Sequence, residues 1–210
     1  MKNFILLVLI TGISATAAIG QAATKITTQE EAARSAIGVG SMMPGFTLRD
    51  SLGNTVKSKD LLAKGNLVLV FYRGAWCPFC NTYLRTLQKN LSKIRENGGE
   101  LVAISAENAD LGMALAKKND LSFTVLSDPD LGTARKFGIV YQLPGETDER
   151  YKSRGLDVAK NNGTDKPELP ISATYVVNSM GEIVFAHIDA DYKKRAEPDA
   201  IIGALAKIGK

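Results

Sequence analysis

The apolar positions of this chain follow two different periodicities. Residues 67–72 form a nearly continuous apolar run of strand length, which is typical of a central strand buried on both faces. Residues 77–97 carry apolar side chains at helical spacing, and Gly98-Gly99 marks the end of that helix. The same two patterns predict strands over 100–105, 122–126, 174–178 and 183–188, and helices over 110–118, up to Phe137 and over 198–208.

The residues before the central strand predict a β-hairpin. Residues 46–62 alternate in polarity and turn at Gly53-Asn54, which is a common hairpin turn. Residues 27–41 are a polar lead-in with one or two helical turns. The element order is therefore a hairpin, three β-α units, a second hairpin and a last helix. This alternation predicts an α/β fold with a mixed sheet covered by helices on both faces.

Residues 141–170 do not fit this rhythm. They are polar and contain Pro144-Gly145, the run Asn161-Asn162-Gly163 and Pro167, all of which favour turns. We interpret them as an inserted loop with one short helix around 147–154. Two uses are open for this segment, a contact between two copies in a homodimer and a lid over the functional site.

The first 22 residues have the pattern of a signal peptide. Lys2 precedes an apolar stretch over 4–13, which is short for a membrane span, and small residues follow it. We therefore divide the chain into a signal peptide (1–22), a lead-in (23–40) and a main domain (41–210). The protein is expected to be exported, to the periplasm or the extracellular space. The alternative is that this segment stays uncleaved as an N-terminal membrane anchor. We expect no other association with a membrane.

Composition narrows the class of protein. The chain has 210 residues and 45% apolar content, enough for one domain with a sizeable core. Its 26 basic and 22 acidic residues give a net charge of +4 and are well mixed along the sequence. No dense Lys/Arg block with interleaved aromatic residues occurs, so nucleic-acid binding is not expected.

Cys77 and Cys80 are the chain's two cysteines, and they lie at the predicted junction between the central strand and its helix. Amide N–H groups and the helix dipole stabilise a thiolate at a helix N-terminus, and the thiolate is the reactive nucleophile. A second thiol three residues away can then close a disulfide. The alternatives are an inert disulfide and a copper(I) site on the two thiolates. His187 is the single histidine, so a zinc site lacks ligands, and no cofactor is expected.

The segment around these cysteines resembles a known family. Residues 71–80, Phe-Tyr-Arg-Gly-Ala-Trp-Cys-Pro-Phe-Cys, are similar to the signature of the peroxiredoxin-like (alkyl hydroperoxide reductase/thiol-specific antioxidant) branch of the thioredoxin superfamily. The resemblance extends over about 41–210. It implies a thioredoxin-like fold and a thiol peroxidase that reduces hydrogen peroxide or organic hydroperoxides and is recycled by a thioredoxin-like protein. Further matching stretches are 43–50, 126–129, 170–178 and 191–198.

The resemblance leaves the roles of the two cysteines open. Typical peroxiredoxins carry Thr or Ser three positions before the peroxidatic cysteine, which places Cys80 at the peroxidatic position and Cys77 at that of the Thr. In thioredoxins the cysteine that follows Trp is the nucleophile, which would be Cys77. The second pattern favours a thiol–disulfide oxidoreductase acting on protein disulfides, and a copper(I) carrier is a third alternative.

One family residue is replaced in this sequence. Typical peroxiredoxins place an Arg before Ala-Thr-Phe to activate the peroxide, and Ser172 occupies that position here. A cation is still needed beside the sulfurs, because the leaving oxygen must be stabilised. Arg73, four residues before Cys77, and Arg195, in the stretch 191–198, are the candidates. Thr174 is the candidate for a hydroxyl near the sulfurs.

Overall fold

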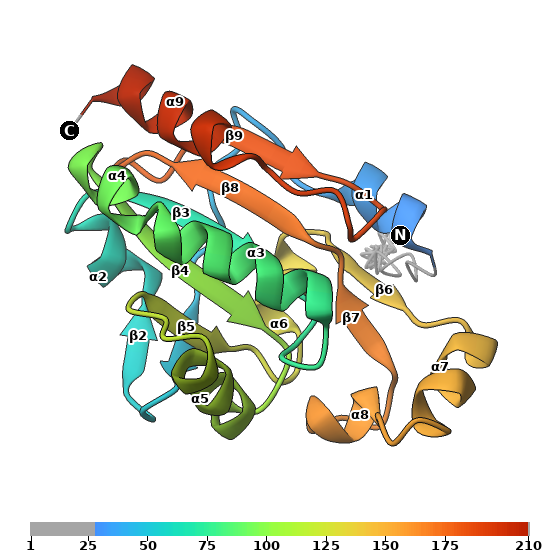
Figure 1. Cartoon of the computed structure of the whole chain (residues 1–210). Helices are drawn as coiled ribbons and strands as arrows, with labels where there is room; N and C mark the ends of the chain where they lie inside the picture. The colour runs from blue at the N-terminus through green and yellow to red at the C-terminus, as the bar shows by residue number, and fades with distance from the viewer. Residues whose placement is uncertain (1–27, 210) are drawn as a thin grey trace, which may run out of the picture.

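The computed structural model describes residues 28–209 (Figure 1). The predicted signal peptide lies outside the described residues. Helix α1 (Gln29–Ser35) supplies the helical turns expected in the lead-in, and Thr28 and Glu31 close a capping box at its start. No helix within 28–209 has the length and apolarity needed to cross a bilayer.

The core of the fold is a mixed sheet whose described strands run in the order β2-β1-β5-β4-β3-β8-β9. Strand β3 lies parallel to β4 and antiparallel to β8, so it is central, as its apolar run predicted. The α/β class is confirmed, and so is the N-terminal hairpin, formed by β1 and β2, but residues 58–62, which were predicted as part of it, form a helix. The strands are β1 (Thr47–Asp50), β2 (Thr55–Lys57), β3 (Asn66–Phe71), β4 (Gly99–Ser105), β5 (Thr124–Ser127), β8 (Ala173–Val177) and β9 (Ile183–Ile188).

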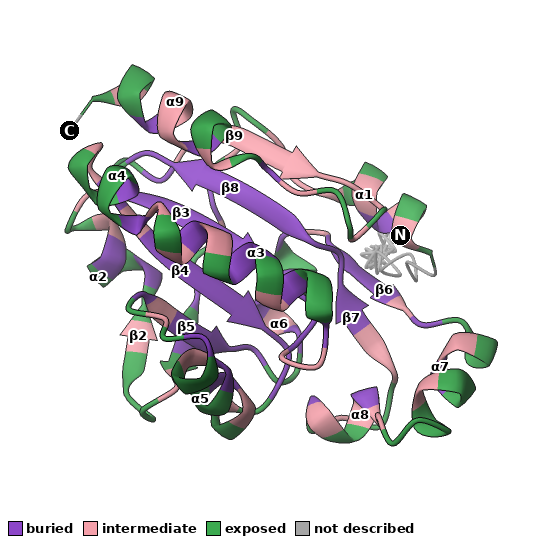
Figure 2. Cartoon of the chain, in the orientation of Figure 1, coloured by how far each residue is buried: buried purple, intermediate pink, exposed green. Residues whose placement is uncertain are grey.

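Helices cover both faces of this sheet, and Figure 2 accordingly shows β3 and most of β4 in the buried colour. Alternate β3 residues serve opposite cores: Leu67 and Leu69 pack on one face, Val68 and Val70 on the other. The first core includes side chains of α1, α2 (Ser58–Leu62) and α6 (Gly132–Lys136). The second includes side chains of α3 (Pro78–Lys89), α4 (Leu91–Glu96), α5 (Ala109–Lys118) and α9 (Pro198–Ile208).

The single helix predicted over 77–97 is in fact two, α3 and α4, which meet at Asn90. The backbone of Asn90 leaves the helical region at ψ 7°, and its side-chain Nδ2 donates to the Thr86 carbonyl at 2.9 Å. An Asn side chain competes in this way with the helical hydrogen bonds. Both helices pack on the same sheet face, so the apolar stripe continues through the break and hides it from periodicity.

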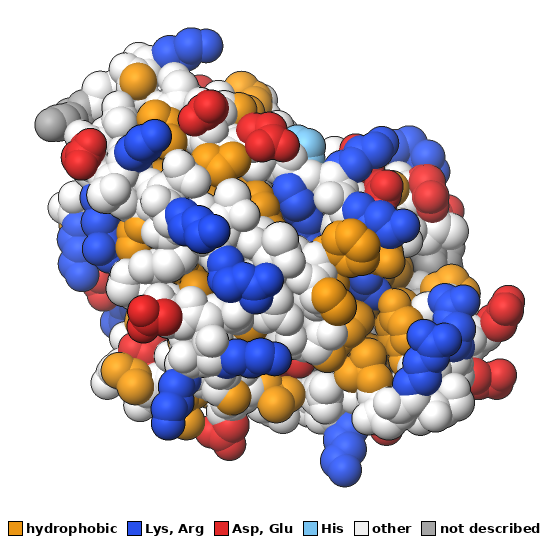
Figure 3. Space-filling model, in the orientation of Figure 1, with side chains coloured by type: hydrophobic (Ala, Val, Ile, Leu, Met, Phe, Trp, Pro, Cys, Tyr) orange, Lys and Arg blue, Asp and Glu red, His pale blue; other side chains and the backbone are white. Residues whose placement is uncertain are grey.

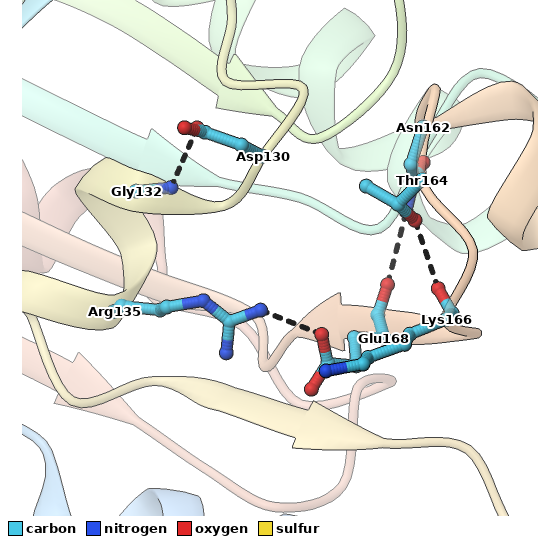
Figure 4. Close-up of polar contacts among 7 residues, drawn as sticks. All are labelled: Asp130, Gly132, Arg135, Asn162, Thr164, Lys166 and Glu168. Carbon is cyan, nitrogen blue, oxygen red and sulfur yellow. Dashed lines mark hydrogen bonds and ion pairs between the residues drawn. The ribbon is translucent and has the colours of Figure 1, made fainter. Parts of the chain in front are cut away.

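The segment 141–170 is more ordered than an inserted loop. Its predicted short helix is α7 (Gly145–Lys152), but a second helix, α8 (Val158–Asn161), and an antiparallel pair, β6 (Val140–Gln142) and β7 (Glu168–Pro170), are also present. Strands of three residues are too short to show alternation. Figure 4 shows how the segment is fastened: Arg135 of α6 pairs with Glu168 at 2.6 Å, and Asn162 Nδ2 donates to the Glu168 carbonyl at 2.9 Å.

Candidate active site

The two cysteines begin the helix that follows the central strand. Cys77 is the N-cap of α3, Pro78 occupies the first turn, and Cys80 lies in the same turn. Asn81 stabilises the turn, because its Nδ2 donates to the carbonyls of Ala75 at 2.7 Å and of Cys77 at 3.1 Å. Both sulfurs therefore belong to the N-terminal turn of a helix, as the strand–helix pattern predicted.

The turn before the cysteines requires a glycine. Gly74 has φ +150°, and a Cβ at this position would lie 2.9 Å from Glu107 Cδ and closer still to the Trp76 ring. Glu107 itself is buried and accepts the Ala75 N–H at 2.5 Å. Burial raises the pKa of Glu107 to about 7. Sequence reasoning missed this carboxylate, although its position two residues after strand β4 places it at the same sheet edge as the cysteines.

The thiols form an asymmetric pair. Cys77 and Cys80 are unbridged, both buried, and 2.9 Å apart. The hydrogen bond from Cys77 lowers the pKa of Cys80 to about 6 against the effect of burial, and the positive charge of Arg195 acts in the same direction. The same hydrogen bond, together with burial, raises the pKa of Cys77. The negative charge of the pair therefore resides on Cys80, stabilised by the S–H of Cys77.

Arg195 reaches Cys80 from the segment before α9. Its Nη2 donates to Cys80 Sγ at 3.4 Å, and its guanidinium lies 5.5 Å from the centre of the Tyr83 ring. Tyr83 Oη in turn lies 3.2 Å from Thr174 Oγ1, so Thr174 joins the site through this tyrosine. Ser172, at the family's arginine position, is buried. The cation beside the Cys80 sulfur is thus Arg195, which lies more than twenty residues after Ser172 in the chain.

Arg73 lies on the other side of the pair and is 3% exposed. Its guanidinium carbon is 4.0 Å from the Tyr192 ring centre and 4.7 Å from that of Trp76. Its Nη2 donates to Tyr151 Oη at 2.6 Å. The four candidate partners of Cys80 named from the sequence, Cys77, Thr174, Arg73 and Arg195, are thus gathered at one end of the sheet.

Two cavities flank the start of α3. One, of about 390 Å³, lies beside Arg195 and Tyr83, and the other, of about 240 Å³, is lined by Cys77, Arg73 and residues of the inserted segment. Phe79, 45% exposed, lines both and packs edge-on against Tyr192. Figure 3 shows hydrophobic side chains gathered around this end of α3, with Lys and Arg side chains beside them.

The sequence pattern of the AhpC/TSA family matches residues 39–186. This chain belongs to the AhpC/TSA family. The chloroplastic peroxiredoxin Q of Triticum aestivum is 28% identical over 80% of this chain and 65% of its own length, and that of Sedum lineare is 30% identical over 64% and 74%. The thiol-disulfide oxidoreductase ResA of Bacillus thuringiensis is 27% identical over 49% and 58%. The chain thus spans less than two thirds of the length of the wheat relative and of ResA.

Solved structures of the same group share the fold of this AhpC/TSA protein. The peroxidoxin BcpB of Mycobacterium tuberculosis has a TM-score of 0.66 at 19% identity, covering 83% of this chain and 99% of its own. Peroxiredoxin Q of Xanthomonas campestris has a TM-score of 0.62 at 18% identity, covering 79% and 92%. The predicted peroxiredoxin-like, thioredoxin-superfamily fold is confirmed.

The geometry of this AhpC/TSA protein suits thiol redox chemistry. One thiol, with a lowered pKa, lies beside a cation, and the second thiol is within reach to close a disulfide. Residues 28–209 bring no three His, Cys, Asp or Glu side chains together as metal ligands. The inserted segment contributes Tyr151, Arg154 and Leu156 to the cavity beside Cys77, so it covers part of the site. The homodimer contact considered for it stays a prediction.

Proposed function

We propose that this protein is an exported thiol peroxidase in which Cys80 is the peroxidatic residue and Cys77 the resolving one. The observation that carries the proposal is that Arg195 Nη2 donates to Cys80 Sγ at 3.4 Å. The attacking thiol needs an ionised sulfur and a donor that stabilises negative charge on oxygen, and Arg195 serves both needs at one atom. Cys77 has the opposite character, since its thiol is the donor of the pair.

The reaction proceeds in two steps at this pair. The Cys80 thiolate attacks the terminal oxygen of the hydroperoxide, the O–O bond breaks, and the leaving alkoxide or hydroxide takes up a proton. Cys77 then attacks the sulfur of the Cys80 sulfenic acid, the S–O bond breaks, and water leaves as the Cys77–Cys80 disulfide forms. A thioredoxin-like protein supplies the two electrons that restore the dithiol.

The compartment follows from the N-terminal pattern of residues 1–22. We propose that the mature protein acts outside the cytoplasm, in the periplasm or the extracellular space. Because that environment is oxidising, the disulfide does not reopen without a dedicated reductant. Fractionation of cells expressing the full chain, followed by mass measurement of the N-terminus, tests export and the cleavage position. Retention of the intact N-terminus in the cytoplasm would contradict export.

The decisive experiment is rapid mixing of the reduced protein with hydrogen peroxide and with an organic hydroperoxide. Trp76, the single tryptophan, is the fluorescent reporter. Wild type, Cys77→Ser and Cys80→Ser are compared. We expect fast oxidation in wild type and in Cys77→Ser, which stops at the sulfenic acid, and none in Cys80→Ser. Oxidation of all three at the rate of an ordinary free thiol would overturn the peroxidase proposal.

A second candidate is a thiol–disulfide oxidoreductase, and two observations favour it. Cys77 lines a cavity of about 240 Å³, whereas Cys80 does not, and the thiol-disulfide oxidoreductase ResA is among the relatives. This function requires Cys77 to be the nucleophile. It predicts that Cys80→Ser still forms a mixed disulfide with a protein substrate, whereas Cys77→Ser does not. The copper(I) alternative is tested by titrating the reduced protein with copper(I) under a competing chelator.

A further inference from the structure

Arg73 is a buried cation without a carboxylate partner among residues 28–209. Its Nη2 donates to the Tyr151 hydroxyl, and its Nε has no hydrogen-bond partner among these residues. Removing a guanidinium from water is costly unless an opposite charge or aromatic faces compensate. Trp76 and Tyr192 supply two such faces, at 4.7 and 4.0 Å from the guanidinium carbon.

This aromatic cage is assembled from three separate parts of the chain. Trp76 belongs to the turn before α3, Tyr151 to α7 of the inserted segment, and Tyr192 to the stretch before α9. Trp76 and Tyr151 also contact each other, with ring centres 5.4 Å apart. A cation held this firmly, with no permanent anion to neutralise it, is suited to an anion that exists only at one stage of a reaction.

Arg73 and Cys77 line the same cavity of about 240 Å³, so the Cys77 thiolate is the transient anion nearest to this role. The pKa of Cys77 is raised chiefly by its hydrogen bond to Cys80 and by burial, and the charge of Arg73 acts in the opposite direction. The other titratable or charged groups around Cys77 are Cys80, Tyr141, Tyr151, Tyr192 and Arg154.

We propose that Arg73 is a positioning residue for the second half of the cycle, in which it stabilises Cys77 as the attacking thiolate. The two arginines then divide the reaction, Arg195 serving Cys80 in the peroxide step and Arg73 serving Cys77 in disulfide formation. This inference rests on the proposed function for its place in the cycle.

The charge relation between the cysteines changes when Cys80 is oxidised. In the dithiol, the Cys77 proton is held by the Cys80 thiolate. Once Cys80 carries a hydroxyl as the sulfenic acid, that negative charge is gone, and Cys77 must give up its proton before it attacks. Arg73 is then the buried positive charge beside it. The Cys77 sulfur is oxidised, the Cys80 sulfur is reduced, and hydroxide leaves with a proton as water.

The first test does not involve peroxide. In a Cys80→Ser background, the rate of Cys77 alkylation by iodoacetamide is measured from pH 6 to 10 with and without Arg73→Met. We expect the midpoint of the profile to move up by about one unit, so that alkylation at the lower pH values falls about tenfold while the plateau rate is unchanged. Arg73→Lys should restore most of the difference. Arg150→Met, which removes an exposed charge from α7, is the matched control.

An unchanged midpoint in Arg73→Met would overturn the proposal. A change in the plateau rate alone would also overturn it, because loosened packing alters the access of iodoacetamide to Cys77 and not the ionisation of that thiol. If Arg73→Met does not fold, Arg73→Lys and Tyr151→Phe are used, and the latter removes the hydroxyl that Arg73 binds. Arg73→Lys keeps the charge and should leave the midpoint close to that of the Cys80→Ser background, whereas Tyr151→Phe should move it upward by less than one unit. An unmoved midpoint in Tyr151→Phe would overturn the proposal.

The second test places Arg73 in the cycle. Samples are quenched with a thiol reagent after mixing with peroxide, and intact mass separates sulfenic acid, disulfide and overoxidised protein. We expect Arg73→Met to slow disulfide formation about tenfold at neutral pH, far more than it slows Cys80 oxidation, and to accumulate sulfinic acid. Equal slowing of both steps would contradict the division of roles. Absence of a fast peroxide step in wild type would refute the peroxidase while leaving the alkylation result intact.

Discussion

Arg195→Met is the substitution that most directly tests the peroxide step. It keeps an apolar stem of similar length and removes the guanidinium whose Nη2 donates to Cys80 Sγ at 3.4 Å. Lys194 precedes it, is exposed, and pairs with Asp189 at 3.5 Å, so Lys194→Met is a control of equal charge change outside the site. Arg195→Lys keeps the charge but loses the planar fork of donors.

The expected size of the effect follows from that contact. A hydrogen bond to a charged group contributes about 1.5–3 kcal/mol, and because Arg195 is only half-buried we take about 1.5 kcal/mol. This equals about one pKa unit and moves the pKa of Cys80 from about 6 toward about 7. The thiolate population then falls about tenfold at pH 5 and hardly at all at pH 8. A further loss of about tenfold should persist at pH 8, because the donor to the peroxide oxygen is also gone.

The assay is stopped-flow oxidation of each reduced variant at several peroxide concentrations between pH 5 and 8. The second-order rate constant is plotted against pH, which separates ionisation from stabilisation of the leaving oxygen. Rates in Arg195→Met equal to wild type across this range would refute the role of Arg195. A loss of similar size in Lys194→Met would show that overall charge, rather than the contact with Cys80, is responsible.

Three further substitutions test how the site is supported. Gly74→Ala should lower the free energy of unfolding by about 2–4 kcal/mol in a urea titration, because the Cβ meets Trp76 and Glu107 at a positive φ, and a change within experimental error would contradict this. Burial raises the pKa of Glu107 to about 7, so its ionisation opposes folding as pH rises from about 4.5 through 7. Glu107→Gln should therefore stabilise the protein by up to about 3 kcal/mol at pH 8 and by little at pH 4. Thermal melts at both pH values test this, and equal effects at the two would refute the reasoning. Thr174→Val leaves the Tyr83 hydroxyl without its partner and should cost about 1–2 kcal/mol, whereas Thr174→Ser retains the bond and should lose less.

Much of the fold was readable from local pattern. The run 67–72 and the helical spacing after it predicted β3 and α3 because burial on two faces and on one face leave different periodicities. The failures share a cause. The break at Asn90 and the strands β6 and β7 leave no periodic signal, since one keeps the apolar stripe intact and the others are three residues long.

The sequence by itself determined that two thiols begin a helix at the end of a central buried strand, because strand, Cys-Pro-Phe-Cys and helix are contiguous. It left the nucleophile undecided, because the two cysteines have the same local chemistry. We assign that role to Cys80 as a proposal that rests on Arg195, which lies 115 positions from Cys80 and reaches its sulfur only when α9 packs on the sheet. The same holds for Arg73: its charge is enclosed by tyrosines that the chain brings from residues 151 and 192. Charge balance at a buried sulfur depends on distances through space, and these are set only once the chain has folded.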